Sequence, residues 1–163
     1  MAAHVLHYGI DHCSRALVLS RFGYSVDICA DFEEFCATLE RDSNPDAVLV
    51  AGSDEARHDE IVSLTRSRSH AALILFGNSS ESTFDLVIAP GTTPAIWLDQ
   101  ISSLIEKTRA LHAASQAVRE ESAQSRRESA LLREQSQLVR EQSVAQQTKA
   151  KKLREILAKK AGI

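Results

Sequence analysis

Short apolar runs alternate with amphipathic segments over residues 1–94. Each run is rich in aliphatic or β-branched side chains and is bounded by polar or turn residues, which is typical of a buried strand. The runs are His4–Tyr8, Ser25–Ala30, Ala47–Ala51, Ala72–Phe76 and Asp85–Ala89. Strands that alternate with helices favour a parallel sheet with right-handed crossovers. The pattern therefore predicts a five-stranded α/β fold.

Three amphipathic segments between these runs predict helices. They are Ser14–Phe22, a segment that begins at Asp31, and a third from about Asp54 to Ser67. Glu34 follows Asp31 by three residues, which is a variant of the capping box at a helix N-terminus. We expect one face of these helices to point inward at Phe32, Phe35, Cys36, Leu39, Ile61 and Leu64.

The rest of the chain has the pattern of one long helix. Residues 95–161 contain neither glycine nor proline and consist largely of good helix formers. Thr93 and Pro94 supply an N-cap and a first helical residue, and Gly162 supplies a stop. At 1.5 Å per residue a continuous helix would reach about 100 Å, too long for one compact domain to bury. We therefore predict two domains, residues 1–93 and residues 94–163.

This predicted helix carries a seven-residue repeat. Serines recur at positions 115, 122, 129, 136 and 143, and a mostly apolar residue follows each serine by three. We assign the serines, then Ala150 and Leu157, to heptad position a, and the other column to position d. A sustained heptad pattern predicts a coiled coil. The residues expected to mediate dimerisation are Leu104, Leu111, Val118, Leu132, Val139, Leu153 and Leu157.

The predicted seam leaves the choice of partner open. Serine at position a buries little apolar area, and Ser125 and Gln146 interrupt the d column. Leu131 and Leu138 widen the apolar stripe. We expect a homodimer, with association to another signalling protein and a lone charged helix as the alternatives.

Charge separates the two parts of the chain. Residues 1–105 hold 6 basic and 15 acidic residues, whereas residues 106–163 hold 13 basic and 7 acidic ones. The basic tail Lys149–Lys160 could contact nucleic acid or anionic lipid. No aromatic residue follows Trp97 to stack on bases. We therefore prefer the simpler interpretation, cations placed at the C-terminus of a helix.

Composition narrows the class of protein further. The three cysteines form no CxxC motif and leave an odd count, so a disulfide framework is not expected. No apolar run approaches the roughly 18 residues that a membrane span needs, and no leader opens the chain. We expect a reduced, cytoplasmic protein without a membrane span. His4 and His7 fall on opposite faces of a strand, so they are not expected to share a metal.

Three segments taken in order resemble the receiver domain of response regulators. They are Phe22–Val26, Ala30–Glu34 and Pro45–Val50, which follow that family's second strand, capped second helix and third strand. The resemblance covers residues 4 to about 108. It implies a receiver-like, flavodoxin-like sheet. The segment Asn78–Phe84 has no room for a full helix before the fifth strand, so the fourth helix is expected to be reduced or missing.

The resemblance also implies where a phosphorylation site would lie, and those positions carry other residues. Gly9 and Ile10 stand where the acidic pair would bind a metal, with Asp11 just beyond. Ala51 stands at the phosphorylated aspartate. The remaining positions are Phe76 or Gly77 for the hydroxyl residue, Ala89 for the lysine, the retained Pro90, and Leu86 for the aromatic switch. No lysine precedes Lys107.

Phosphoryl transfer needs a carboxylate nucleophile, a bound metal and cationic groups, and these positions supply none of them. We therefore expect a degenerate receiver without metal or cofactor. Its expected role is non-enzymatic signalling or scaffolding through protein–protein contact. The alternatives are a response regulator phosphorylated at Asp11 or Asp54, and a nucleic-acid-binding adaptor that uses the basic tail.

Overall fold

The computed structural model describes residues 2–11, 13–41, 44–52, 55–78 and 83–160. The chain divides into two compact units, Met1–Ala114 and Ser115–Ile163, and each is described by itself. We placed the predicted domain boundary at residue 94, where the long helix begins, and this boundary stays a prediction. No described helix has an apolar stretch long enough to cross a membrane.

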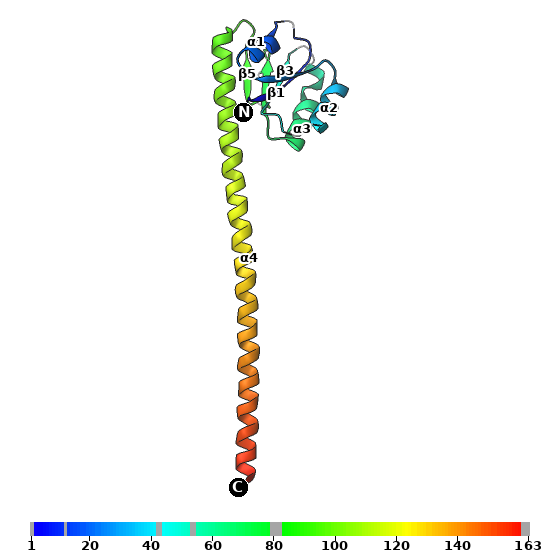
Figure 1. The fold of residues 1–163 in the computed structure, drawn as a ribbon. Helices are drawn as coiled ribbons and strands as arrows, with labels where there is room; N and C mark the ends of the chain where they lie inside the picture. The colour runs from blue at the N-terminus through cyan, green and yellow to red at the C-terminus, as the bar shows by residue number, and fades with distance from the viewer. Residues whose placement is uncertain (1, 12, 42–43, 53–54, 79–82, 161–163) are drawn as a thin grey trace. The chain divides into compact units, whose positions relative to one another are not determined.

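Five parallel strands form the centre of the first unit (Figure 1). They are β1 (His4–Tyr8), β2 (Ser25–Cys29), β3 (Ala47–Ala51), β4 (Ala72–Phe76) and β5 (Leu86–Ile88), in the order β2-β1-β3-β4-β5. This is the flavodoxin-like order of a doubly wound sheet. The predicted receiver-like fold class is confirmed.

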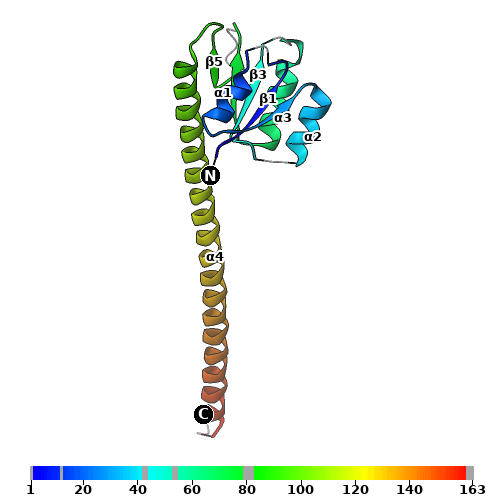
Figure 2. The same cartoon turned by 45° about the horizontal axis from the view of Figure 1, so that its top comes forward.

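The helices cover both faces of this sheet. They are α1 (Arg15–Arg21), α2 (Phe32–Arg41), α3 (His58–Arg68) and α4 (Pro94–Lys160), with a short 3₁₀ turn, η1 (Glu55–Arg57), before α3. The views in Figures 1 and 2 place α1 and the first part of α4 on one face, and α2 and α3 on the other. A parallel sheet covered on both faces explains why β3 and β4 are buried along their whole length.

The start of α4 is part of the core of the first unit. Trp97, Leu98, Ile101 and Ile105 are buried with α1 and with the side chains of β1, β3, β4 and β5 on that face. The helix begins at Pro94, as predicted, and the Thr93 carbonyl accepts hydrogen bonds from the N–H groups of Ile96 and Trp97. The predicted stop at Gly162 lies outside the described residues.

The opposite face packs around α2 and α3. Phe35, Leu39 and Ile61 are buried, as expected, whereas Phe32, Cys36 and Leu64 are only half-buried beside them. The capping box forms: the Asp31 carboxylate accepts from the Glu34 N–H at 2.8 Å. In return the Glu34 carboxylate accepts from the Ala30 N–H at 2.8 Å. That second bond explains why β2 ends at Cys29, one residue earlier than predicted.

Two further boundaries differ from the predictions. α3 begins at His58, after η1, whereas the helix was expected from about Asp54, a residue outside the described ones. β5 is shorter than predicted by one residue at each end. At its start the Asp85 side chain is engaged: Oδ2 accepts from the Leu73 N–H at 2.8 Å, and Oδ1 accepts from Arg66 at 2.6 Å. Residues 77–78 and 83–85, the described part of the β4–β5 connection, contain no helix, which agrees with the predicted reduction.

Candidate functional site

The carboxyl edge of the sheet is closed where β1 and β3 end. Gly9 has a φ of +92°, and a Cβ built on it would lie 3.1 Å from the Cβ of Ala51. Ala51 is itself buried at the end of β3. A larger side chain at residue 9 would be strained by the positive φ and would meet Ala51. The two positions expected to be degenerate therefore pack against each other. Ile10 beside them points to solvent.

Asp11 serves as a helix cap. Its Oδ1 accepts from the Arg15 N–H and its Oδ2 from the Ala16 N–H, both at 2.9 Å, at the first turn of α1. Partial burial alone would raise the pKa of Asp11, but these hydrogen bonds outweigh it and hold the pKa below its ordinary value. Both carboxylate oxygens of Asp11 therefore accept hydrogen bonds from backbone N–H groups. Ser14, the N-cap residue of α1, makes no side-chain capping bond.

An arginine and two aromatic rings occupy the place expected for the hydroxyl residue. The Arg15 guanidinium lies 4.2 Å from the centre of the Phe76 ring. The edge of Phe76 meets Trp97 of α4 at a centroid distance of 5.6 Å. A cation over a desolvated ring is worth about 1–2 kcal/mol. This edge is therefore held together by cation–π and apolar packing.

A shallow hollow of about 190 Å³ adjoins these side chains, with exposed Ala89 and Pro90 on its rim. Gly77 follows Phe76, and its N–H donates to the Ile88 carbonyl at 3.1 Å, so the backbone continues the sheet there. Across the described residues, no group of three or more His, Cys, Asp or Glu side chains gathers where a metal could bind. The described residues at this edge do not offer the set of oxygen ligands that Mg²⁺ needs for phosphoryl transfer.

His7 lies beneath this edge, fully buried on β1. Neither ring nitrogen makes a hydrogen bond of good geometry to a described residue. Burial lowers the pKa of His7, and the nearby Asp11 carboxylate opposes this only in part. The ring is thus kept neutral as part of the core. Burial likewise raises the pKa of the Cys29 thiol, so this cysteine is not an activated nucleophile.

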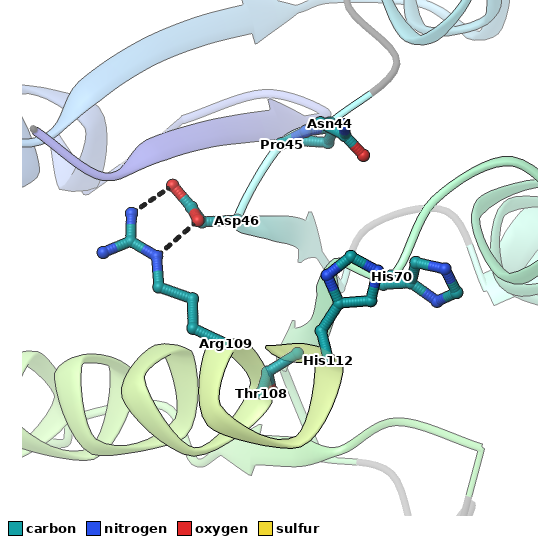
Figure 3. Close-up of a pocket in the computed structure, with 7 residues that line it drawn as sticks. All are labelled: Asn44, Pro45, Asp46, His70, Thr108, Arg109 and His112. Carbon is teal, nitrogen blue, oxygen red and sulfur yellow. Dashed lines mark hydrogen bonds and ion pairs between the residues drawn. The ribbon is translucent and has the colours of Figure 1, made fainter. Parts of the chain in front are cut away.

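The amino edge of the sheet carries the most connected carboxylate, Asp46 (Figure 3). Arg109 of α4 donates to it through two nitrogens, Nε to Oδ1 and Nη2 to Oδ2, both at 2.7 Å. Oδ2 also accepts from the His4 N–H at 2.8 Å. A two-pronged arginine–carboxylate pair fixes geometry as well as energy. Asp46 therefore ties α4 to β1 beside a hollow of about 190 Å³.

Replacing Asp46 with asparagine should make the free energy of unfolding less dependent on pH in the acid range. Burial alone would raise the pKa of Asp46. The hydrogen bond from Arg109, together with the one from the His4 N–H, outweighs burial and lowers the pKa. A carboxylate with a lowered folded pKa contributes its full stability above the unfolded pKa of about 4 and loses it as pH falls through the folded pKa. Asp46→Asn should cost about 1–2 kcal/mol at pH 7, a figure reduced for the half-exposed guanidinium. Urea unfolding from pH 7 to 3 should show this cost shrinking below pH 4.

The matched control is Asp27→Asn. Asp27 is half-exposed and pairs with His4 Nε2 at 3.2 Å at the same edge of the sheet. An exposed pair of this kind should contribute about 0.5 kcal/mol or less. Equal costs for the two variants would contradict a clamping role for Asp46.

Two histidines stack beside the Asp46–Arg109 pair. The rings of His70 and His112 lie 4.4 Å apart with planes tilted by 34° (Figure 3). His70 follows α3 and His112 lies in α4, so the contact adds a second attachment between the helix and the loop before β4.

From Leu111, near the end of the first unit, α4 exposes its apolar column. Leu111, Val118, Leu132, Val139, Leu153 and Leu157 are all exposed. Leu104 differs, because it is half-buried against the core of the first unit. The free part of the predicted dimerisation column therefore begins at Leu111. Leu131 and Leu138 are exposed next to it.

Some contacts of the site could not be found by sequence reasoning. Arg109 and Asp46 are 63 residues apart, and no sequence pattern pairs them. The pairs Arg15–Phe76 and His70–His112 likewise join residues from different elements. The one available signal was the position of Asp46, directly before a buried strand.

No protein-family model matches the chain, and no curated protein matches it. Solved structures do. An adenylate cyclase structure from Rhodopirellula baltica matches with a TM-score of 0.62 and 10% identity, over 73% of this chain and 98% of that one. A response regulator receiver protein from Sinorhizobium medicae matches with a TM-score of 0.56 and 12% identity, over 66% and 97%. A response regulator from Thermotoga maritima gives 0.55 and 13%, over 65% and 99%. At these identities the likeness shows a shared receiver-like fold.

Proposed function

We propose that this chain is a non-catalytic signalling or scaffold protein. Its receiver-like unit works without phosphorylation, through protein–protein contact, and α4 joins two copies of the chain. The proposal rests on the carboxyl edge of the sheet, where a Cβ built on Gly9 would lie 3.1 Å from the Cβ of Ala51. The side chains of these two residues offer no carboxylate that could accept a phosphoryl group or bind a metal.

Two further observations support a signalling role. The receiver-like fold is shared with proteins described as response regulators from two bacteria. The Arg109–Asp46 pair and the buried Trp97 hold the start of α4 against the sheet. A partner that binds the receiver-like unit would therefore act on the same packing that positions α4.

The alternative of a phosphorylated response regulator has less support. Asp11 follows the two positions expected to bind a metal, and both of its oxygens accept backbone hydrogen bonds. Attack on a phosphodonor would require the loss of that cap, which is worth about 1 kcal/mol. Asp54, the other candidate, lies outside the described residues. No lysine precedes Lys107 to assist either of them.

Sedimentation equilibrium of the full chain beside a fragment of residues 1–114 tests the proposal. The fragment keeps both core clusters, Arg109 and His112, and forms a compact unit of its own. We expect the full chain to be a dimer and the fragment a monomer. Adding Mg²⁺ and a small phosphodonor should change neither the assembly nor the intact mass of the full chain.

Each component of the proposal has its own contrary outcome. A gain in mass of one phosphoryl group, lost on Asp11→Asn, would support the response-regulator alternative. A full chain that stays monomeric would remove the homodimer and favour a different signalling protein as the partner of α4. A dimeric fragment would place the interface on the first unit.

A further inference from the structure

The charged residues of α4 are arranged for contact with another helix. Oppositely charged side chains stabilise a single helix when they are three or four residues apart. Between residues 115 and 148 no acidic and basic residue have either spacing. Arg126 instead donates from Nε to the Ser122 carbonyl of its own helix at 3.1 Å. Glu128 accepts a hydrogen bond from Gln124 Nε2 of the same helix at 3.0 Å. These charged residues therefore contact their own helix through local hydrogen bonds, and the spacing of the charges gives no ion pair within this segment.

The same charges flank the apolar column with one sign on each side. The position after each d residue, position e, holds arginine in four successive heptads. The position before each a residue, position g, holds glutamate and then glutamine. The two sets are Arg119, Arg126, Arg133 and Arg140 at e, and Glu121, Glu128, Gln135 and Gln142 at g. In coiled coils, e and g residues set partner choice and helix direction.

We propose that a second copy of this chain covers the column, parallel and in register over residues 115–147. This rests on the proposed function. In a parallel pair each g residue faces the e residue of the next heptad in the partner. Glu121 then meets Arg126 of the second copy, and Glu128 meets its Arg133. In an antiparallel pair e faces e and g faces g, so arginine would meet arginine.

The interruptions of the seam fix the register. In register, Ser125 and Gln146 each face their own counterpart in two polar layers. A shift by one heptad would set Ser125 against Leu132 and Gln146 against an apolar residue. Two copies that pair in register around a two-fold axis also leave no unpaired segment at either end of the coiled coil. The in-register alignment keeps polar layers together and apolar layers together.

The charges also set where the pairing ends. In the following heptad Lys149 at g would face Arg154 at e of the second copy. This like-charge contact is repulsive, and the neighbouring Lys151 and Lys152 add to it. The paired segment therefore stops before residue 149. Leu153 and Leu157, which the heptad pattern had assigned to dimerisation, then lie in the basic tail and outside the seam.

Disulfide trapping tests the direction and the register. Ser122→Cys and Ser143→Cys each place a thiol at position a, with Cys13→Ser in the background because Cys13 is exposed. A disulfide requires Cα atoms about 4.4–6.8 Å apart. In a parallel, in-register dimer both variants should oxidise to covalent dimers joined at the substituted position. Glu134→Cys, on the outer face at position f, should stay uncrosslinked.

The outcomes separate this inference from the proposed function. Sedimentation of the same variants under reducing conditions first shows whether a dimer exists. A monomer there would overturn both. A reduced dimer that crosslinks at only one of the two positions, or at neither, would overturn the parallel in-register alignment alone.

A charge exchange provides a second readout. Glu128→Arg places two arginine–arginine contacts in each dimer and should raise the dissociation constant about tenfold. Arg133→Glu should do the same, and the two together should restore it to within about threefold. Glu134→Arg, the same substitution on the outer face, should have little effect. No recovery in the combined variant would overturn the proposed pairing.

Discussion

Replacing Trp97 with alanine should lower the free energy of unfolding of the first unit by about 3–5 kcal/mol. Trp97 is almost fully buried at the start of α4, with its ring against the edge of Phe76. The substitution removes a large apolar surface and leaves a cavity beneath Arg15, whose guanidinium lies over the same Phe76 ring. Urea unfolding of residues 1–114, followed by far-UV circular dichroism, measures the change. Fluorescence cannot follow it because the chain has one tryptophan.

Ile96→Ala is the matched control for this prediction. Ile96 precedes Trp97 in the same helical turn, but its side chain is 53% exposed. It should cost about 0.5 kcal/mol or less, as exposed positions usually do. Similar costs at both positions would show that the start of α4 does not belong to the core of the first unit.

The strands that sequence reasoning placed correctly are those buried on both faces. β1, β3 and β4 begin and end where they were predicted. β3 and β4 are uninterrupted apolar runs, and in β1 the apolar residues Val5, Leu6 and Tyr8 are buried together with His7. β2 and β5 were predicted too long. At their ends a side chain takes over a backbone hydrogen bond: Glu34 binds the Ala30 N–H, and Asp85 binds the Leu73 N–H. Such local competition leaves no mark in hydrophobic periodicity.

Sequence reasoning could predict which phosphorylation-site residues are replaced at the candidate site. It could not predict the contacts that the replacing residues make. The topology brings Gly9, Ala51 and Phe76 to one edge of the sheet, as the resemblance implied. That Gly9 packs on Ala51, and that Arg15 covers Phe76, depends on backbone conformation and helix placement. The heptad count extended the dimerisation column back to Leu104, because the same apolar period serves the core and the seam.

The apolar seam of α4 should be far more sensitive to a charge than the rest of its surface. Val139→Asp should raise the dissociation constant of the dimer at least about 100-fold, which corresponds to about 2.7 kcal/mol. Val139 occupies position d, so each dimer would lose two buried valines and gain two facing carboxylates without partners. Sedimentation equilibrium over a range of concentrations measures the change, with far-UV circular dichroism to report helix content.

Val144→Asp is the matched control for Val139→Asp. In the described chain Val144 and Val139 are equally exposed, at 62% and 61%, and both lie in α4. The same substitution therefore alters helix propensity and surface charge alike at both positions. Val144 falls at position b, away from the predicted seam, and its substitution should change the dissociation constant less than about threefold. Pairing through the a and d columns is therefore what would make the two substitutions differ in their effect on the dissociation constant. Equal weakening by both variants would place the contact surface elsewhere on the helix.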